Sequence, residues 1–351
     1  MAYTTIKKST DYFNTKLHTG DGGGSGSSTG IGFQPDMVWS KSRTEALNHT
    51  MFDSVRGAGS NKELTPNGAG TEGGANSAGF GYISAFNSDG YSWTAGSTNT
   101  ENFNKSSQNY ANWCWKANGA GSANTDGSIS STVSANTTSG FSIVTYTGGG
   151  GNATVGHGLG VAPGMMIIKN RSASQSWVVY HQSIGNTKNL YLNNTDATNT
   201  TSGWFNNTSP TSTVFTIGND GAVSGNGNNL VAYCFAEKQG FSKFGSYIGN
   251  GNADGTFVYT GFKPAFVMNK KTDGTMSWHI WDNKRNSYNI VDKLVYPNLS
   301  NAEDTLTSFD FVSNGFKIRD NRTFVNASGS PYIYMAFAEQ PLVGDNPATA
   351  R

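Results

Sequence analysis

Cys114 is the first residue in this sequence whose type could do chemistry, and it stands between two tryptophans in NYANWCWKAN (residues 109–118). A thiolate is a nucleophile and a metal ligand, and two thiols can form a disulfide. The only other cysteine is Cys234, and the chain has no C-x-x-C or clustered Cys/His spacing. Cys114 and Cys234 align in the repeats described below, where a third repeat has Ala336. We therefore interpret both cysteines as small packing residues, without a metal and without a disulfide.

Two D-x-x-R stretches place opposite charges three residues apart, as Asp53 and Arg56 in MFDSVRG and as Asp282 and Arg285 in IWDNKRN. Such a pair could take part in catalysis, but nothing nearby supplies a partner for it. The corresponding stretch between them, VYHQSIG, has neither charge. We predict that Asp53, Arg56, Asp282 and Arg285 form structural ion pairs, each joining a loop to the end of a strand.

Other catalytic and ligand-binding patterns find no support in the sequence. A glycosidase needs two carboxylates about 5–10 Å apart, but acidic residues are sparse here and none recurs in all three repeats. The five histidines occupy unrelated positions. The glycine runs lack the Lys-Ser/Thr ending of a phosphate-binding loop. We therefore expect no catalytic residue, no bound metal and no cofactor.

Tryptophan rings can stack on sugars, and the chain has eight of them. Most lie in stretches of apolar alternation, which favours a place in the core. Trp204 is different because it stands with Phe205 in the polar stretch SGWFNNTSP. Two adjacent rings in a polar loop are costly to leave bare. We therefore predict that Trp204 and Phe205 contact a glycan or a partner protein.

The stretch around Cys114 occurs twice more, as LVAYCFAE at residues 230–237 and YIYMAFAE at 332–339. Large side chains alternate with smaller ones in all three stretches, which is the period of a strand with one face in a core. The predicted core-facing positions are Trp113, Trp115, Tyr233, Phe235, Met335 and Phe337.

A second block also occurs three times, as GFQPDMVWSK, GVAPGMMIIK and GFKPAFVMNK. Each block contains an aligned proline, at Pro35, Pro163 and Pro264, and each ends in an aligned lysine, at Lys41, Lys169 and Lys270. The residues 18 positions after the prolines are Asp53, His181 and Asp282. An equal interval in three places indicates triplication. The lysines are interpreted as exposed strand ends, as caps of backbone carbonyls, or as a contact shared between repeats.

These blocks divide the chain into three diverged repeats, residues 1–118, 119–239 and 240–351, which we call segments 1, 2 and 3. The runs after the prolines are apolar on both faces, as in strands inside a sandwich, and long helical stripes are absent. Asp-Gly and Asn-Gly pairs predict hairpins at residues 89–90, 220–221, 254–255, 273–274 and 314–315. The predicted fold is all-β, with three tandem β-sandwiches of lectin or jelly-roll type and six or seven strands in each. The repeats form either separate small domains or one pseudo-threefold body.

Composition narrows the classes of partner. The chain has 24 Lys and Arg against 23 Asp and Glu, and only 13% of its residues are charged. This balance gives no electrostatic reason to expect nucleic acid or a membrane surface as a partner. No apolar run is long enough to span a bilayer, and the N-terminal stretch MAYTTIKKSTDYF lacks the apolar core of a secretory signal. We expect a protein that stays in the cytosol or leaves the cell inside a particle.

The pattern formed by FQPDMVWSK, MFDSVRGA and YANWCWKA resembles a domain of unknown function that recurs in virion structural proteins of marine tailed phages. The resemblance implies a decoration, fibre or appendage protein without known catalysis. It also implies assembly in the host cytoplasm, release by lysis, and other virion proteins as partners in a symmetric assembly. The alternative expectation is a lectin-like tail fibre or adhesin that recognises host surface glycans. A polysaccharide-degrading enzyme ranks last because no carboxylates recur.

Overall fold

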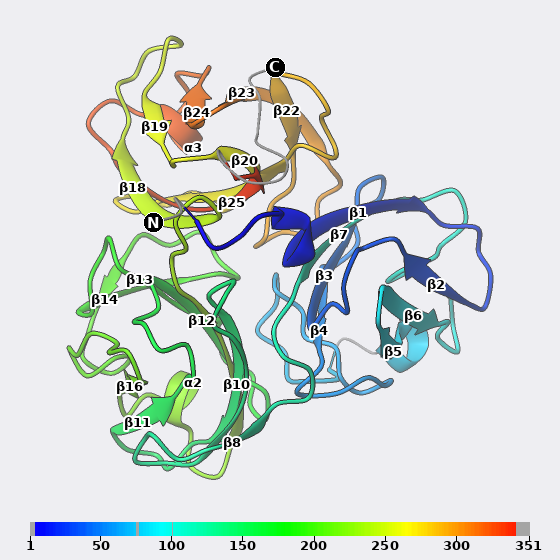
Figure 1. The fold of residues 1–351 in the computed structure, drawn as a ribbon, viewed down its shortest axis with the longest axis vertical. Coiled ribbons are helices and arrows are strands. Elements are labelled where there is room, and N and C mark those ends of the chain that lie inside the picture. Colours follow the sequence, from blue (N-terminus) through cyan, green and yellow to red (C-terminus); the bar gives the residue numbers. More distant parts are fainter. Residues whose placement is uncertain (1–3, 75–76, 100, 342–351) are drawn as a thin grey trace.

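The computed structural model describes residues 4–74, 77–99 and 101–341, and antiparallel strands in several sheets make up nearly all of its regular structure (Figure 1). The strands are short because Gly, Asn and Ser interrupt every apolar run. Helix is confined, in the described part, to one 3-10 turn and three single turns: η1 (Ser9–Asp11), α1 (Ser77–Phe80), α2 (Gly221–Ser224) and α3 (Thr323–Asn326). The all-β prediction is confirmed.

Three sheets, which we call the inner sheets, share one strand order. In each, the last strand of a segment lies between two earlier strands of that segment. Segment 1 has β1 (Phe13–Thr19), β7 (Asn109–Trp115), β3 (Met37–Ser42) and β4 (Thr50–Asp53). Segment 2 has β10 (Phe141–Thr147), β17 (Asn229–Phe235), β12 (Met165–Asn170) and β13 (Val178–His181). Segment 3 has β18 (Ser242–Ile248), β25 (Pro331–Gln340), β20 (Lys263–Lys271) and β21 (His279–Asp282).

The inner sheet of segment 2 is wider than the other two. Two further strands continue it beyond β13, namely β14 (Lys188–Tyr191) and β15 (Asn199–Thr200). Two more continue it beyond β10, namely β9 (Ser131–Asn136) and β8 (Ser122–Asn124). β10 therefore has a neighbouring strand on both sides. The corresponding strands β1 and β18 each have one neighbouring strand in the described structure.

An outer sheet packs on each inner sheet. Segment 1 has β2 (Ser25–Thr29), β6 (Gly90–Thr94) and β5 (Tyr82–Asn87). Segment 2 has β11 (Ala153–Gly156) and β16 (Val214–Ile217). Segment 3 has β19 (Phe257–Tyr259), β24 (Gly315–Ile318), β23 (Asp304–Val312) and β22 (Val291–Leu294). A separate hydrophobic cluster fills the space between the two sheets of each segment.

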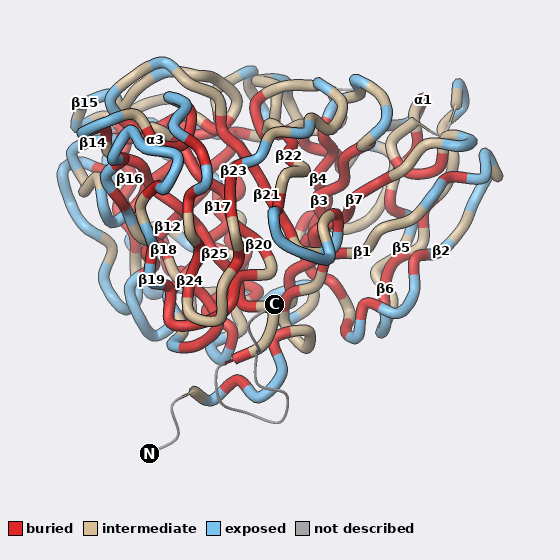
Figure 2. The backbone as a smooth tube through the Cα atoms, turned by 90° about the horizontal axis from the view of Figure 1, so that it is seen from above, coloured by how far each residue is buried: buried red, intermediate tan, exposed pale blue. Residues whose placement is uncertain are grey.

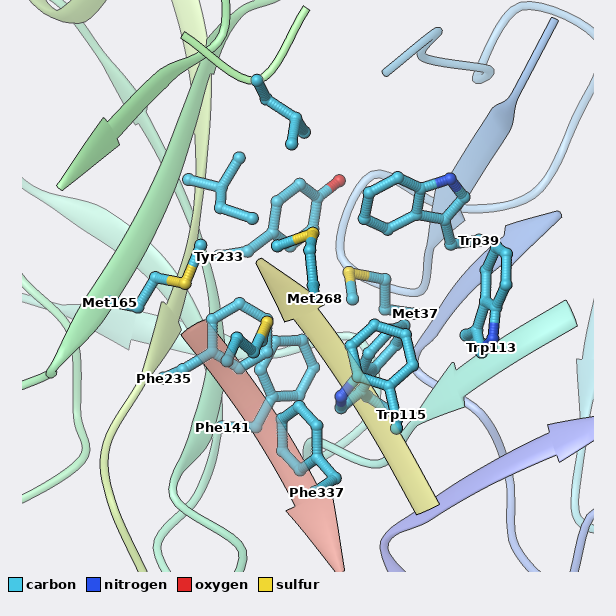
Figure 3. Close-up of a cluster of buried hydrophobic side chains, with 14 of the residues drawn as sticks. Met37, Trp39, Trp113, Trp115, Phe141, Met165, Tyr233, Phe235, Met268 and Phe337 are labelled. Atoms are coloured by element: carbon cyan, nitrogen blue, oxygen red, sulfur yellow. The ribbon is translucent and has the colours of Figure 1, made fainter. Parts of the chain in front are cut away.

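The other faces of the three inner sheets meet in one shared core. Figure 1 shows the segments as three lobes around a common centre, and Figure 2 shows buried stretches running along the inner strands. A single hydrophobic cluster joins residues of all three segments there, and Trp115, Phe235 and Phe337 lie close together in it (Figure 3). Inner strands therefore bury both faces, which explains why their sequences are apolar on both.

The final strand of segment 1 illustrates this two-sided burial. Trp113 and Trp115 enter the shared core, whereas Cys114 enters the cluster inside segment 1. The alternation along 109–118 is thus one of large and small side chains, with both sets buried. The sequence predicted which residues share a face, but it did not predict that the smaller face is also in a core.

Two of the five predicted hairpin turns join paired strands directly. The turn at residues 89–90 connects β5 to β6, and the turn at 314–315 connects β23 to β24. The hairpin prediction at 220–221 was wrong. Asp220 instead caps α2, because its carboxylate accepts a hydrogen bond from the Ala222 N–H, as aspartate commonly does at a helix start.

Candidate functional site

The residue 18 positions after each proline lies where one segment meets another. Asp53 of segment 1 accepts a hydrogen bond from the Tyr233 hydroxyl of segment 2, at 2.7 Å. Asp282 of segment 3 accepts one from the Trp113 indole N–H of segment 1, at 3.0 Å. We call these contacts junction 1–2 and junction 3–1. Both carboxylates are fully buried, and both donors belong to a predicted core strand.

Each of these aspartates also holds the arginine three residues after it. The Arg56 Nε lies 2.5 Å from Asp53, and the Arg285 Nε lies 2.6 Å from Asp282, with all four side chains fully buried. Burial alone would lower the pKa of Arg56, but Asp53, Tyr233 and Glu72 together outweigh burial and raise that pKa. Each buried guanidinium therefore has a carboxylate of its own segment as its direct partner.

A second carboxylate completes junction 1–2. Glu72 lies in the long loop of segment 1 and binds Arg56 at 2.9 Å. The same side chain binds Arg171 of segment 2 at 2.6 Å. The backbone repeats this link, because the Glu72 N–H donates to the Arg171 carbonyl at 3.0 Å. Junction 1–2 is therefore a chain of four alternating charges, of which Asp53 and Arg56 are fully buried and Glu72 and Arg171 are partly buried.

Junction 3–1 has the same construction. Glu303 of segment 3 binds Arg285 at 3.2 Å and Arg43 of segment 1 at 2.8 Å. The Glu303 N–H donates to the Arg43 carbonyl at 2.8 Å. Hydrogen bonding to Glu303 raises the pKa of Arg43. Arg43 stands eight residues after Pro35, and Arg171 stands eight residues after Pro163, so the two arginines are also equivalent in sequence.

The third junction, between segments 2 and 3, replaces these charges by neutral residues. His181 occupies the aspartate position, and its Nε2 donates to the Tyr334 carbonyl at 3.1 Å. Ile184 stands at the position of the two arginines. The Thr198 N–H donates to the Thr272 carbonyl at 2.9 Å, so two threonines take the places of Glu and Arg. Three contacts of one kind therefore close a ring, with two charged junctions and one neutral junction.

Acid should weaken the fold through His181. The Ser183 N–H donates to Nδ1 of His181, which fixes the neutral form, and burial lowers the pKa of this histidine from 6.5 to about 4. The unfolded chain therefore takes up the proton at a higher pH than the folded chain. The free energy of unfolding is at its full value above pH 6.5, and it falls by about 3 kcal/mol as the pH drops to 4.

The measurement is urea unfolding at several pH values between 7 and 4 for the natural chain and for His181→Asn. Asparagine keeps an oxygen acceptor for the Ser183 N–H but does not titrate. The contributions of the other buried histidines to the pH dependence are the same in both proteins and cancel in the comparison. We expect a shallower decline in the variant. Equal declines in the two proteins would contradict the assignment.

The three aligned lysines are buried, and their amines donate to backbone carbonyls. Lys169 reaches the Ala69 carbonyl of segment 1 at 2.9 Å, and Lys270 reaches the Thr195 carbonyl of segment 2 at 3.2 Å. Lys41 bonds carbonyls of its own segment. Burial lowers the pKa of Lys41 to about 7 and of the other two to about 8. The lysines are carbonyl caps, and two of them also join segments.

The remaining candidates lie in packed interiors. Cys114 and Cys234 are free and fully buried, and burial raises the pKa of both thiols, so neither is an activated nucleophile. Trp204 is 8% exposed and Phe205 is 1% exposed. They pack edge-on against Tyr191 and Tyr180, respectively. The expectation that these two rings form a contact surface is therefore corrected, because neither presents a face to a ligand.

Sequence analysis missed a pair of aromatic residues that do reach the surface. Phe257 and Tyr259 of β19 are 46% and 56% exposed. Both point away from the core because Val258, between them, points into it. The signal was present in TFVYT as an alternation with the aromatic residues on the outer face.

Within residues 4–74, 77–99 and 101–341, no three His, Cys, Asp or Glu side chains are grouped so as to hold a metal ion. In the same ranges, no helix has the length and hydropathy needed to cross a bilayer.

A family described as a domain of unknown function, DUF7483, matches residues 8–341. The match begins before β1 and ends after β25, so it includes all three inner sheets and all three junctions. No curated protein and no solved structure matches the chain.

Proposed function

We propose that this chain, which belongs to the DUF7483 family over nearly its whole length, is a non-enzymatic structural component of a tailed-phage virion. In this role it is a surface decoration or appendage protein that binds other virion proteins in a symmetric assembly. It is made in the host cytoplasm and is released within the particle by lysis. The resemblance of its first segment to virion repeat domains motivates this proposal.

We further propose that the chain is a tandem triplication with pseudo-threefold symmetry, with repeats at residues 1–118, 119–239 and 240–351. The shared strand order of the inner sheets supports it. So does the register, because Met37 faces Trp115, Met165 faces Phe235 and Phe266 faces Phe337 at aligned positions. A triplicated body can seat on a symmetric particle with three similar contacts.

The ring of junctions is the observation that carries the structural role. Asp53, His181, Asp282 and the three lysines align between segments, and all six are buried. Hydrogen bonds to other protein groups already engage these side chains, so they are not displayed to a substrate. Buried polar contacts of this kind favour a rigid structural body in which the three segments are joined to one another.

Mass spectrometry of gradient-purified phage particles tests the virion assignment. The particles should come from a lysate of the host in which this chain is made. We expect its peptides in the particle fraction at a fixed ratio to the major capsid protein, and cryo-electron microscopy should then show a triangular body on the particle surface. Recovery of the chain only in the soluble part of the lysate would contradict the proposal.

The lectin-like alternative keeps one specific observation in its favour. A groove in segment 3 carries the two exposed aromatic residues of β19, and no strand covers it in the described structure. Glycan binding and incorporation into a virion are compatible, since attachment proteins are also parts of the particle.

A further inference from the structure

A groove opens between the edges of the two sheets of segment 3. β18 forms one wall and β19 forms the other, and Tyr334 of β25 lines the space between them. Gln182 and Glu237 of segment 2 stand at its border, so the groove continues into the junction between segments 2 and 3. Its volume is about 420 Å³, within the range of roughly 300–1,000 Å³ that is typical of small-molecule sites.

Gly245 is the reason that the groove is hollow. It pairs with Tyr334, whereas the equivalent position has Val144 in segment 2 and Lys16 in segment 1. A Cβ atom on Gly245 would lie 2.6 Å from the Tyr334 hydroxyl oxygen, so only glycine lets this ring lie across β18. Tyr334 is 3% exposed, and no residue that the structure describes hydrogen-bonds its hydroxyl group. An unpartnered hydroxyl on a buried side chain thus lines the groove.

The chain closes the corresponding space in its other two segments. In segment 2, residues 129–136 run between β10 and β11, where β9 pairs with β10 and the Ile129 N–H donates to the Thr154 carbonyl. In segment 1, the Asn14 side chain bridges the space by donating to the Ile31 carbonyl at 2.9 Å. The open space in segment 3 is therefore a departure from the pattern of its own chain.

Aromatic residues line the groove in segment 3 but not the filled space in segment 2. Phe257 and Tyr259 take the places that Thr154 and Gly156 hold in β11. Their rings are two of the most exposed large apolar groups of the described surface, and exposed rings side by side favour a ligand. Gly245, the unpartnered Tyr334 hydroxyl and the two exposed rings all belong to segment 3, where the space between the sheet edges is open.

The polar border favours a compact ligand over an added strand. Glu237 Oε1 already accepts the Phe244 N–H at 2.9 Å, and Gln182 Nε2 donates to the Phe244 carbonyl at 2.6 Å. The Ile248 carbonyl accepts a bond from Thr256. These bonds occupy backbone groups of Phe244 and Ile248 that an incoming strand would need. Side-chain donors and acceptors beside aromatic faces remain available.

We propose that this groove binds a neutral pyranose residue of an oligosaccharide. The apolar C–H face of the sugar ring packs on Tyr259 and Phe257, because the negative face of an aromatic ring attracts polarised C–H groups. The Tyr334 hydroxyl, Glu237 and Lys243 bond the sugar hydroxyls. The opposite charges of Glu237 and Lys243 favour a neutral sugar. This inference goes beyond the virion role and does not depend on it.

An array of bacterial polysaccharides and oligosaccharides, probed with the full fluorescently labelled chain, tests the proposal. We expect retention of a neutral glycan, and calorimetric titration with the free oligosaccharide then measures affinity. Tyr259→Ala should weaken binding about tenfold or more, since aromatic anchors dominate such sites. Tyr334→Phe removes only the hydroxyl and should weaken binding severalfold.

Tyr288→Ala is the matched control. Tyr288 is 76% exposed but does not line the groove, so this variant should bind as the natural chain does. Circular dichroism shows whether each variant keeps its fold. If Tyr259→Ala does not fold, Tyr334→Phe alone tests the groove. Three results would overturn the proposal: no glycan retained on the array, unchanged affinity in both groove variants, or selection of an extended peptide in place of a glycan. Absence from virions would leave it standing, so the two proposals fail separately.

Discussion

Asp282→Ala should lower the free energy of unfolding by about 3–5 kcal/mol, the usual cost of breaking a buried ion pair from one side. The Arg285 guanidinium would stay in the interior without its closest counter-charge. The Trp113 indole N–H would lose its acceptor, as would the Arg285 backbone N–H. All of these groups are buried, so water cannot replace the carboxylate. Thermal and urea unfolding of the purified variant measure the loss.

Segment 2 supplies the matched control for this experiment, since its junction works with His181 and Ile184. The double variant Asp282→His with Arg285→Ile copies that neutral pair into segment 3. It removes both buried charges together, and such exchanges are often nearly neutral. Arg43 keeps Glu303 as its partner in the double variant. We expect the double variant to regain at least half of the stability that Asp282→Ala loses.

The two variants separate the effect of an orphaned charge from the effect of lost packing. If the stability of the double variant were as low as that of the single variant, shape would matter more than charge at the junction. If Asp282→Ala cost less than about 1 kcal/mol, the pair would behave as a solvent-exposed ion pair does. Either outcome would contradict a buried electrostatic link between segments 3 and 1.

Sequence patterns located the inner sheets because their spacing is rigid. The lysines and the residues 18 positions after the prolines lie on adjacent strands, where an insertion would shift every side chain to the other face. The two aspartates were recognisable for the same reason. Cys114 was interpretable as packing because similar stretches stand at residues 230–237 and 332–339, the second with Ala336 in its place.

The partners of those aspartates were not predictable in this way. Glu72 lies 37 residues after Pro35, Thr198 lies 35 after Pro163, and Glu303 lies 39 after Pro264. Loops of unequal length separate these residues from the prolines, so no constant interval marks them. Loops tolerate insertions because they run over the surface. The structure is needed to show that the three residues make the same backbone contact.

The sequence led to a wrong prediction for Trp204 and to no prediction of the groove, and the two reasons are opposite. A polar sequence around Trp204 suggested exposure, but the loop folds back and buries the ring against Tyr191. The groove depends on an absence, since Gly245 stands where the other segments have a side chain. An open space between two edge strands leaves no motif in a single sequence.

Trp115→Ala should cost about 3–5 kcal/mol of unfolding free energy, the usual range for removing a large buried aromatic side chain. The Trp115 ring lies 5.0 Å from Phe13, 5.9 Å from Phe266, 5.8 Å from Phe337 and 6.3 Å from Phe235, measured between ring centroids. These neighbours belong to all three segments. Alanine would therefore open a cavity where the inner sheets meet, and unfolding experiments in urea would measure the loss.

Two matched variants show whether the loss comes from the shared core. Trp115→Phe installs the residue that Phe235 and Phe337 already provide at the aligned positions, so it should cost less than half as much. Cys114→Ala changes the opposite face of the same strand to the residue found at Ala336, and it should cost about 1 kcal/mol, as small buried truncations do. A ranking in which Cys114→Ala is as damaging as Trp115→Ala would contradict the central role of the shared core. The expected ranking would mean that the three segments stabilise one another, because a cavity at their meeting point weakens all three inner sheets at once.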